Sequence, residues 1–505
     1  MIVVDQLGYS YIERFEGLYE GGFRTLLDEG ASFSNAKYRH GITVTAAGHA
    51  TISTGKHPSH TGMVGNSWRG YDPAGEFANI NCVADFAEDR TAIGGKGAVA
   101  SPVNLLADSI GDLLKRQHQG SKVVSISWKD RAANLLAGRE ADAAFWYSKD
   151  CGCLITSNYF VDETPAWLAK FNDSGVIDKF GGRSWERRDA AIEVYEKNAR
   201  ADEFPGEPPE DASFPHAMPE APELYGKINP TPFTDAALME GAKAMIEAYE
   251  LGADGETDIL AIGLSGTDYI GHRWGPHSQE AMDAHLRLDS ELGELFKFID
   301  EKVGLDNAVI VLSADHGALP LVEFVDGAKR VSPKSLAGTV NKAVAAEFPD
   351  TGPVVASAGG GNIYFDLPGL EEAGVEIAKI VPIAKAALLE SEDVAEVFTQ
   401  EDLKSASGEG PYWQLFRNSF FERRSPHLMV RLKENYFPGG SSGTGHGSAY
   451  EYDRHVPLML LGPGIKPGRY SDDAGPDEIS PTLARLLGFE MSLEPGSRVL
   501  EEVLQ

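Results

Sequence analysis

The chain has little cysteine. Its 505 residues contain three cysteines, Cys82, Cys151 and Cys153, which is too few for a scaffold held together by disulfides. The Cys-Gly-Cys pair also lacks the second cysteine pair of a zinc ribbon. The sequence leaves open whether Cys82 pairs with Cys151 or Cys153.

Long apolar runs are missing as well. Hydrophobic residues make up 42% of the chain, but no run reaches the roughly eighteen apolar residues of a membrane span, so we expect none. The chain opens on MIVVDQ, which predicts a core strand and lacks the charged and apolar regions of a signal peptide. We therefore expect either a cytoplasmic protein or an exported one whose leader has been lost.

Positive charge is scarce, with 45 lysines and arginines against 76 aspartates and glutamates and a formal net charge of -31. This charge argues against nucleic acid as a partner. It also repels a phosphorylated substrate at long range, so a site for such a substrate must contain cations of its own. The length allows two or three domains, or one α/β domain with insertions.

Apolar strands alternate with helical patterns along most of the chain, which is the rhythm of a parallel sheet covered by helices. Strands are expected in IVVD, KVVSISW, DILAIGL, AVIVLSA, HLMVRL and VPLMLLG. Helices are expected near 15–29, 104–117, 234–251, 278–301 and 480–487.

Two stretches interrupt this rhythm. Residues 151–225 are rich in Pro, Glu, Asp and aromatic residues, which is typical of a surface or cap insertion. Residues 330–410 form a second block, with a strand pair expected in ASAGGGNIYFDL. Because we find no internal repeat, we predict a single α/β domain over residues 1–505 with two insertions.

Carboxylates follow three of the predicted strands. Asp5, Asp268 and Asp315 come at or shortly after the ends of IVV, DILAIGL and AVIVLSA. The carboxyl ends of parallel strands meet in one crevice, so these carboxylates should converge there.

Histidines accompany these carboxylates. His272 lies four residues after Asp268 on one face of a helical turn, His316 follows Asp315, and His446 lies in the glycine-rich loop T-G-H-G-S. A single histidine of this kind is more often structural, but together with the carboxylates these residues predict a metal site.

The segment T-V-T-A-A-G-H-A-T contains Thr45 at a predicted helix start, among small residues that let an anion approach the backbone. A threonine there is on its own most often an N-cap. A hydroxyl at the positive end of a helix and bound to a divalent cation would instead ionise near neutral pH. We therefore predict Thr45 as a nucleophile because metal ligands occur elsewhere in the chain.

Seven motifs in one order, spread over nearly the whole chain, resemble the alkaline phosphatase superfamily. They are VVDQ, T-V-T-A-A-G-H, GMVGN ending at Asn66, W-K-D-R with Lys129 and Arg131, DYIGH, ADHG and GHGSAYEYDRHVPL. Within the superfamily they resemble the bacterial PafA-like and PhoK-like alkaline phosphatases with a threonine nucleophile, which are related to type I phosphodiesterases and nucleotide pyrophosphatases.

The resemblance implies an alkaline-phosphatase-like α/β fold, with a mainly parallel sheet between helices and inserted cap segments. It also implies two zinc ions, one held by Asp5, Thr45, Asp315 and His316 and the other by Asp268, His272 and His446. Asn66, Lys129 and Arg131 would contact the phosphoryl oxygens. Such enzymes hydrolyse phosphate monoesters through a phosphothreonine, and a periplasmic or secreted location is implied.

Two alternatives stay open. A phosphodiesterase or nucleotide pyrophosphatase of the same superfamily has a similar metal site but lacks the Lys-Asp-Arg pair, whose charges suit a monoester dianion. A non-catalytic metal-binding or phosphate-binding protein would need a broken site. Sulfatases are disfavoured, because none of the cysteines lies in the Cys/Ser-x-Pro-x-Arg pattern. The physiological substrate and the oligomeric state are not predicted.

Overall fold

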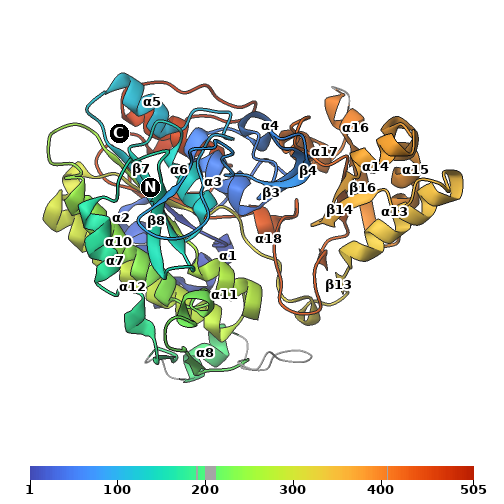
Figure 1. Cartoon of the computed structure of the whole chain (residues 1–505). Helices are drawn as coiled ribbons and strands as arrows, with labels where there is room; N and C mark the ends of the chain where they lie inside the picture. Colours follow the sequence, from blue (N-terminus) through green and yellow to red (C-terminus); the bar gives the residue numbers. More distant parts are fainter. Residues whose placement is uncertain (189–191, 200–211, 406–407) are drawn as a thin grey trace.

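A ten-stranded sheet forms the centre of the protein in the computed structural model, which describes residues 1–188, 192–199, 212–405 and 408–505 (Figure 1). Its strands run in the order β20-β2-β19-β12-β1-β11-β6-β7-β8-β5. Their bounds in this order are Gly468–Tyr470, Ala31–Phe33, Leu458–Leu461, Ile310–Ser313, Ile2–Val4, Ile259–Leu264, Val123–Ser127, Ala143–Ser148, Cys153–Ser157 and Ala92–Ile93.

The middle of this sheet is parallel. β12, β1, β11, β6 and β7 pair in parallel, whereas β19 is antiparallel to both of its neighbours and β8 is antiparallel to β7. The parallel strands are buried along almost their whole length, which explains why they appear in the sequence as unbroken apolar runs. The predicted mainly parallel α/β sheet is confirmed.

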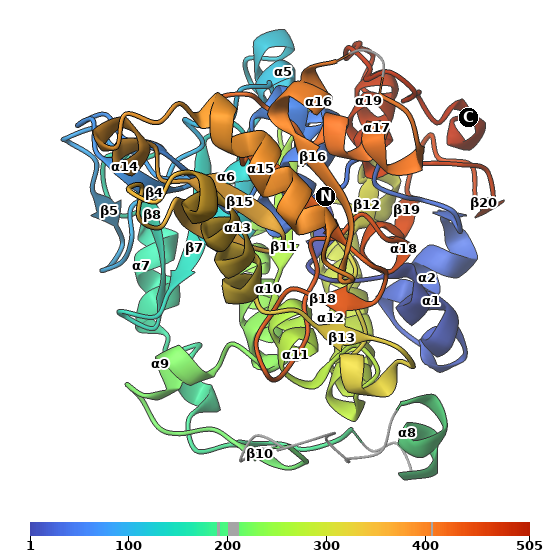
Figure 2. The ribbon, with the colours of Figure 1, turned by 90° about the vertical axis from the view of Figure 1, so that its right-hand side faces the viewer.

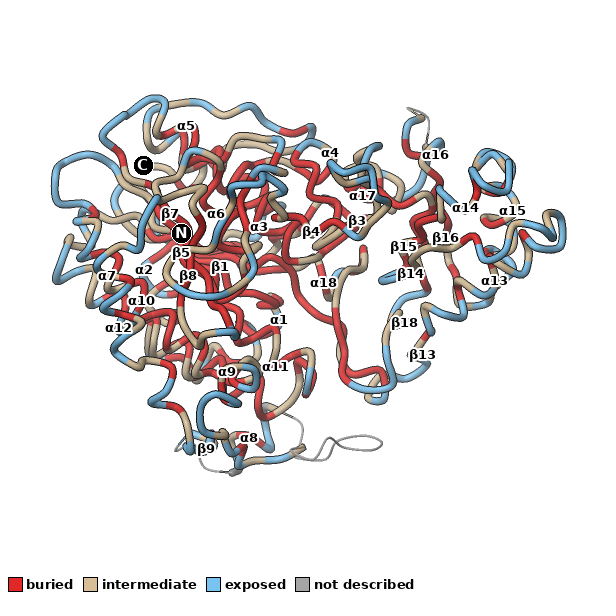
Figure 3. The backbone as a smooth tube through the Cα atoms, viewed as in Figure 1, coloured by how far each residue is buried: buried red, intermediate tan, exposed pale blue. Residues whose placement is uncertain are grey.

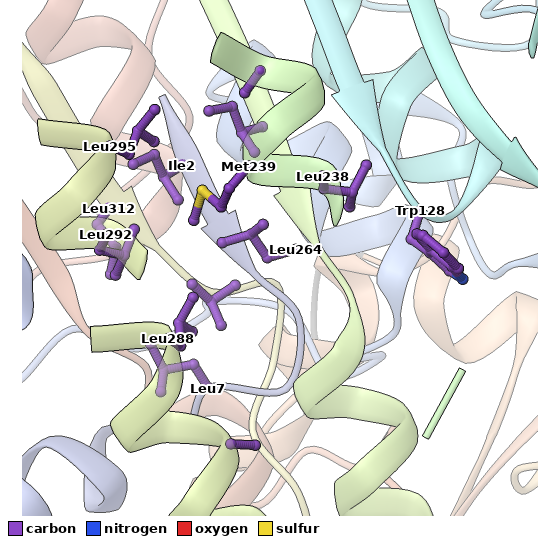
Figure 4. Close-up of a cluster of buried hydrophobic side chains, with 14 of the residues drawn as sticks. Ile2, Leu7, Trp128, Leu238, Met239, Leu264, Leu288, Leu292, Leu295 and Leu312 are labelled. Carbon is purple, nitrogen blue, oxygen red and sulfur yellow. The ribbon is translucent and has the colours of Figure 1, made fainter. Parts of the chain in front are cut away.

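Helices cover both faces of the central sheet. One layer contains α1 (Tyr9–Phe15), α2 (Gly22–Glu29), α7 (Ala166–Asp173), α10 (Phe233–Ala248) and α12 (Gln279–Lys302). The other contains α3 (Thr45–Thr54), α5 (Ile110–Gln117), α6 (Asp130–Ala137) and α19 (Ile479–Leu486). Figure 4 shows leucines of α12 and Met239 of α10 packed on Ile2, Leu264 and Leu312 of the sheet.

The helix predicted near 15–29 is wrong as a single element, because α1 ends at Phe15 and α2 begins at Gly22. The turn between them lies tightly on α12, where a Cβ at Gly21 would lie 2.2 Å from the carbonyl oxygen of Asp289. The Asp289 carboxylate accepts hydrogen bonds from the N–H groups of Gly21 and Phe23 at 2.7 and 2.8 Å. This close contact with another element cannot be inferred from helical periodicity.

A second, four-stranded antiparallel sheet lies to one side of the core in Figure 1 and faces the viewer in Figure 2. Its order is β14 (Val355–Gly359), β15 (Asn362–Phe365), β17 (Leu428–Leu432) and β16 (Val394–Thr399), and it is covered by α13 (Pro333–Glu347) and α15 (Ile377–Leu389). The predicted strand pair is the hairpin β14–β15. HLMVRL was wrongly predicted to continue the central sheet, because it forms β17 and pairs with β15 and β16.

The stretch 151–225 begins inside the core. β8 belongs to the central sheet, so the sheet extends beyond the boundary expected at residue 151. Further along, Trp185 and Tyr195 are buried and donate hydrogen bonds to Asp283 of α12 at 2.7 and 2.6 Å. The Pro-rich and Glu-rich residues 200–211 lie outside the described residues.

The structure shows neither of the two disulfides of Cys82 that the sequence left open. Cys151 and Cys153 form a disulfide with each other, and Cys82 is buried and unpaired. Among the residues that the structure describes, no helix is long and apolar enough to cross a membrane.

Shorter elements complete the chain, and Figure 3 shows that exposed residues gather in many of the connections. The remaining strands are β3 (Ser67–Tyr71), β4 (Phe77–Asn81), β9 (Ser184–Trp185), β10 (His216–Ala217), β13 (Lys329–Arg330) and β18 (Tyr436–Phe437). The remaining α-helices are α4 (Pro58–Thr61), α8 (Ile192–Asn198), α9 (Leu224–Lys227), α11 (Gly266–Trp274), α14 (Leu367–Glu372), α16 (Gln400–Lys404), α17 (Pro411–Asn418) and α18 (Glu451–Arg454).

Candidate active site

Three strands bring predicted site residues to one edge of the central sheet. Asp5 directly follows β1, Lys129 lies two residues beyond β6, and Asp315 lies two residues beyond β12. β1 pairs with β11 and β12, and β11 pairs with β6, all in parallel, so their carboxyl ends are neighbours. All three side chains are buried. The expected convergence at this edge is therefore present.

Helix α11 follows β11 and carries two further predicted ligands. Asp268 lies in its first turn and His272 in its last turn, four residues apart on one face. The Asp268 Oδ1 atom lies 3.1 Å from His272 Nε2 and 3.6 Å from His446 Nε2. The structure thus groups Asp268, His272 and His446 within reach of one metal ion.

A second group lies around the end of β1. Asp5, Asp268 and His316 offer ligand atoms within 4.8 Å of one another. His316 Nε2 lies 3.4 Å from Asp5 Oδ1 and also 3.4 Å from Asp315 Oδ2. The predicted neighbours Asp5, Asp315 and His316 therefore meet, and Asp268 takes part in both groups.

Backbone carbonyl groups orient the three histidine rings. Their Nδ1 atoms lie next to backbone carbonyl oxygens: His272 to Thr444 at 2.7 Å, His446 to Thr43 at 2.7 Å and His316 to Gly317 at 2.9 Å. A carbonyl oxygen only accepts, so each Nδ1 carries a proton and each Nε2 faces the carboxylates.

These residue types fit a divalent cation such as zinc. Asp5 Oδ1, Asp315 Oδ2 and His316 Nε2 are buried and make no hydrogen bond within the described part of the chain. Buried acceptors without a donor are costly, and a cation bound by imidazole and carboxylate would satisfy them.

Burial and neighbouring charges shift the pKa values of the candidate ligands. Burial, together with Asp268 and Asp315, raises the pKa of Asp5 well above its ordinary value. Burial lowers the pKa of His316 and His446, which keeps both imidazoles neutral, as metal ligation requires. Burial also favours a raised pKa for Asp268, but the nearby His272 and Lys129 outweigh burial and lower this pKa well below its ordinary value.

Helix α3 begins at Thr45, which is buried, and its first turn lies on Asp315. The contact depends on Gly48, because a Cβ there would lie 2.3 Å from the Asp315 carbonyl oxygen. His49 Nδ1 lies 2.9 Å from the Thr45 carbonyl oxygen and 3.3 Å from Asp315 Oδ2. The small residues of the motif thus let the helix start reach the ligand groups.

Asn66 also reaches the start of α3. Its Oδ1 atom accepts a hydrogen bond of 2.9 Å from the N–H of Ala46, the residue after Thr45. This bond satisfies one of the free N–H groups of the first helical turn. The Asn66 amide therefore lies at the first turn of the helix that Thr45 begins.

Lys129 and Arg131 have different surroundings. The Lys129 Nζ atom lies 2.6 Å from Asp5 Oδ2 and 2.6 Å from Asp268 Oδ2. Arg131 lies in the first turn of α6 beside Cys82. Both residues line a pocket together with Trp128, Tyr147, Asn229 and Tyr269. The sequence predicted two cations aimed at one phosphoryl group, whereas Lys129 here pairs with two carboxylates.

Several residues that support the site have no assigned role in the sequence analysis. Gln6 donates from its backbone to Asp315 Oδ1 at 3.1 Å and from Nε2 to Asp268 Oδ1 at 2.8 Å. The Asp453 carboxylate accepts from the N–H of Ser448, close to His446, at 2.7 Å. Gln6 lies in the VVDQ motif, and its φ of 65° marks the sharp turn after β1. Asp453 lies in the GHGSAYEYDRHVPL motif, but the motif alone did not give it a role.

Residues 1–455 match the family of type I phosphodiesterases and nucleotide pyrophosphatases. The chain is 31% identical to alkaline phosphatase PhoV of Synechococcus elongatus, over 100% of this chain and 92% of PhoV. It is 32% identical to a protein of Myroides odoratus named calcium-transporting ATPase, over 97% of this chain and 91% of that protein.

The same likeness extends to a solved structure. Alkaline phosphatase PafA of Elizabethkingia meningoseptica is 31% identical over 100% of this chain and 93% of PafA. A crystal structure of PafA matches with a TM-score of 0.91 at 30% identity and covers 100% of this chain and 98% of that one.

The fold and the ligand groups define an α/β protein with candidate metal-binding residues at the carboxyl edge of its sheet. The chain belongs to the type I phosphodiesterase and nucleotide pyrophosphatase family, and its fold is that of PafA. The resemblance and the fold class that the motifs predicted are thereby confirmed.

Proposed function

We propose that the protein is an alkaline phosphatase that hydrolyses phosphate monoesters with two zinc ions and with Thr45 as nucleophile. One observation carries this proposal. Two groups of Asp and His side chains, which share Asp268, lie beside the helix that starts at the buried Thr45. The names and the structure of close relatives support the activity.

The proposed zinc ligands are the two sets that the family resemblance implied. One ion would be held by Asp5, Thr45, Asp315 and His316, and the other by Asp268, His272 and His446. Bound zinc would supply Lewis-acid charge that lowers the pKa of the Thr45 hydroxyl and offsets charge on the leaving oxygen.

The chain's own residues would then carry the reaction. Thr45 Oγ1 attacks phosphorus, the bond to the leaving oxygen breaks, and a phosphothreonine forms. Water attacks this phosphothreonine in line and releases phosphate, which restores Thr45. The positive end of the α3 dipole and the Asn66 amide stabilise the charge on the phosphoryl oxygens.

Arg131 and Lys129 supply the cationic part of the phosphoryl site in this proposal. A solved PafA variant carries replacements of a threonine, an asparagine, a lysine and an arginine, which are the four residue types proposed here. Two positive charges favour a dianion over the monoanion of a diester, so the monoesterase is preferred over the phosphodiesterase alternative. The two insertions would rim the pocket, and export to the periplasm or medium remains a prediction.

One experiment tests the proposal. Wild type, Thr45→Ser and Thr45→Ala are assayed on a monoester and a diester of the same phenol, with zinc measured by elemental analysis. We expect zinc in all three proteins, a monoester preference in wild type, substantial activity in Thr45→Ser and a loss of about a thousandfold or more in Thr45→Ala. Acid trapping should place phosphate on Thr45.

Each competing function gives a different result in the same assay. A wild type that prefers the diester would establish the phosphodiesterase alternative. A protein that binds zinc or phosphate without turnover would be a binding protein. Phosphate trapped on another residue would remove Thr45 from its role.

A further inference from the structure

Lys129 lies between the carboxylates of Asp5 and Asp268, two of the candidate metal ligands. Its ammonium lies 2.6 Å from one oxygen of Asp5 and 2.6 Å from one oxygen of Asp268. All three side chains are buried, with an exposed fraction of 6% or less. One lysine therefore bridges two carboxylates from different parts of the chain, one directly after β1 and one in α11.

The bridged carboxylates belong to the candidate metal groups. Asp5 is part of one group and Asp268 is part of both. Each uses Oδ2 for Lys129 and turns Oδ1 toward an imidazole, with Asp5 Oδ1 at 3.4 Å from His316 Nε2 and Asp268 Oδ1 at 3.1 Å from His272 Nε2. Lys129 and a metal ion would thus draw on the negative charge of the same two carboxylates.

Charge balance explains why a lysine suits this position. Asp5, Asp268 and Asp315 are buried close together, and buried like charges repel strongly unless a cation lies between them. A lysine supplies a compact charge on a flexible stem, so it can change partners more readily than a planar guanidinium.

We infer that Lys129 is a built-in counter-ion that stabilises the metal-free protein through Asp5 and Asp268 and competes with zinc for the charge of these carboxylates. Zinc binding then frees the ammonium for the phosphoryl group. This inference rests on the zinc sites of the proposed function.

Removing the Lys129 charge should change both the stability of the metal-free protein and its zinc affinity. Lys129→Met keeps much of the stem but removes the charge, so the metal-free protein should melt at a lower temperature than wild type. Its zinc affinity should rise by about tenfold or more, because zinc no longer has to displace a buried cation. A lysine that served only to position the carboxylates would weaken zinc binding when removed.

The test measures zinc dissociation constants by chelator competition and melting temperatures with and without zinc. Arg131→Met is the matched control, since it removes a nearby cation whose side chain lies beside Cys82. Lys129→Arg keeps the charge and should retain a zinc affinity close to that of wild type. If Lys129→Met folds only with zinc, the rate of zinc loss to excess chelator should be slower than in wild type.

The outcomes separate this inference from the proposed function. Two bound zinc ions in wild type, with tighter binding in Lys129→Met alone, support it. Equal changes in Lys129→Met and Arg131→Met, or weaker binding in Lys129→Met, overturn it and leave the zinc sites standing. A wild type that binds no zinc overturns the proposed zinc sites and this inference together.

Discussion

Single buried carboxylates hold the ligand-bearing elements in place, and Asp235 of α10 is a clear case. Its Oδ1 accepts hydrogen bonds of 3.0 Å from the N–H groups of both Ser265 and Gly266, where α11 begins. Asp235 therefore caps the helix that presents Asp268 and His272.

The capping carboxylate gives a pH prediction. Burial raises the pKa of Asp235 to about 6, against the effect of its two N–H donors. Because the pKa of Asp235 is higher in the folded state, the protonated carboxyl contributes to the stability of the fold. This contribution is complete below the unfolded-state pKa of about 4 and is lost as the pH rises through about 6. Asp235→Asn keeps a capping oxygen, so its unfolding free energy relative to wild type should rise between these pH values by up to about 3 kcal/mol.

Urea unfolding of zinc-saturated protein from pH 4 to 7 measures this difference. Asp85→Asn is the control, because Asp85 has a lowered pKa: burial opposes the shift, but Ser101, Arg90 and the N–H of Ala87 outweigh it. Its contribution is lost only as the pH falls below about 4, so the control should be flat over this range. A flat profile for Asp235→Asn would show that Asp235 is not protonated in the fold.

At the scale of elements, the position of helix α3 depends on the close contact between Gly48 and the backbone of Asp315. Gly48→Ala would place a Cβ 2.3 Å from the carbonyl oxygen and 2.6 Å from the Cα of Asp315, and neither atom can move without shifting the ligand loop. We expect a loss of about 1–3 kcal/mol in unfolding free energy. We also expect a marked fall in kcat, because Thr45 lies one turn away on the same helix.

Gly338 of α13 provides the matched control. It is also a helical glycine, but nothing lies within 4 Å of a Cβ at that position. Gly338→Ala should therefore stabilise the protein by about 0.5–1 kcal/mol and leave kcat unchanged. Equal effects of the two substitutions on stability and kcat would contradict the role of the α3 contact.

The sequence predicted individual strands and helices better than it predicted which other elements they contact. Asp5 and Asp315 could be placed because the ends of parallel strands share one edge of a sheet. HLMVRL was assigned to the wrong sheet, since an apolar strand does not encode which sheet it joins. The bridge from Lys129 to Asp5 and Asp268 joins residues 124 and 139 positions apart. No local pattern contains such a contact.

At the scale of the whole molecule, two arginines connect the four-stranded sheet to the core. Arg424 donates to the carbonyl oxygens of Gly62 and Asn104 at 2.9 and 2.7 Å. Arg431 of β17 donates to the hydroxyl of Tyr450 at 2.5 Å. A crevice between the two parts is lined by Arg431, Tyr450 and His446. The second sheet therefore borders the candidate site, which supports the proposal that this insertion rims the pocket.

The net charge of -31 acts on the molecule as a whole. Folding brings these charges together, so their repulsion lowers the stability of the compact state. Salt shortens the range of the repulsion, to about 10 Å at 0.1 M and about 3 Å at 1 M. We therefore expect the melting temperature of the zinc-saturated protein to rise by a few degrees between low and moderate NaCl concentrations.

Calorimetry over a NaCl series measures this rise, and surface variants identify its cause. Glu88, Asp89, Asp162 and Glu163 are exposed acidic residues. Changing all four to the corresponding amides reduces the net negative charge without touching the site, so the melting temperature should be higher at low salt and should rise less steeply with NaCl. KCl should act like NaCl, because screening depends on ionic strength. A melting temperature that falls with salt, or a slope unchanged by the four substitutions, would show that self-repulsion does not limit the stability of this acidic protein.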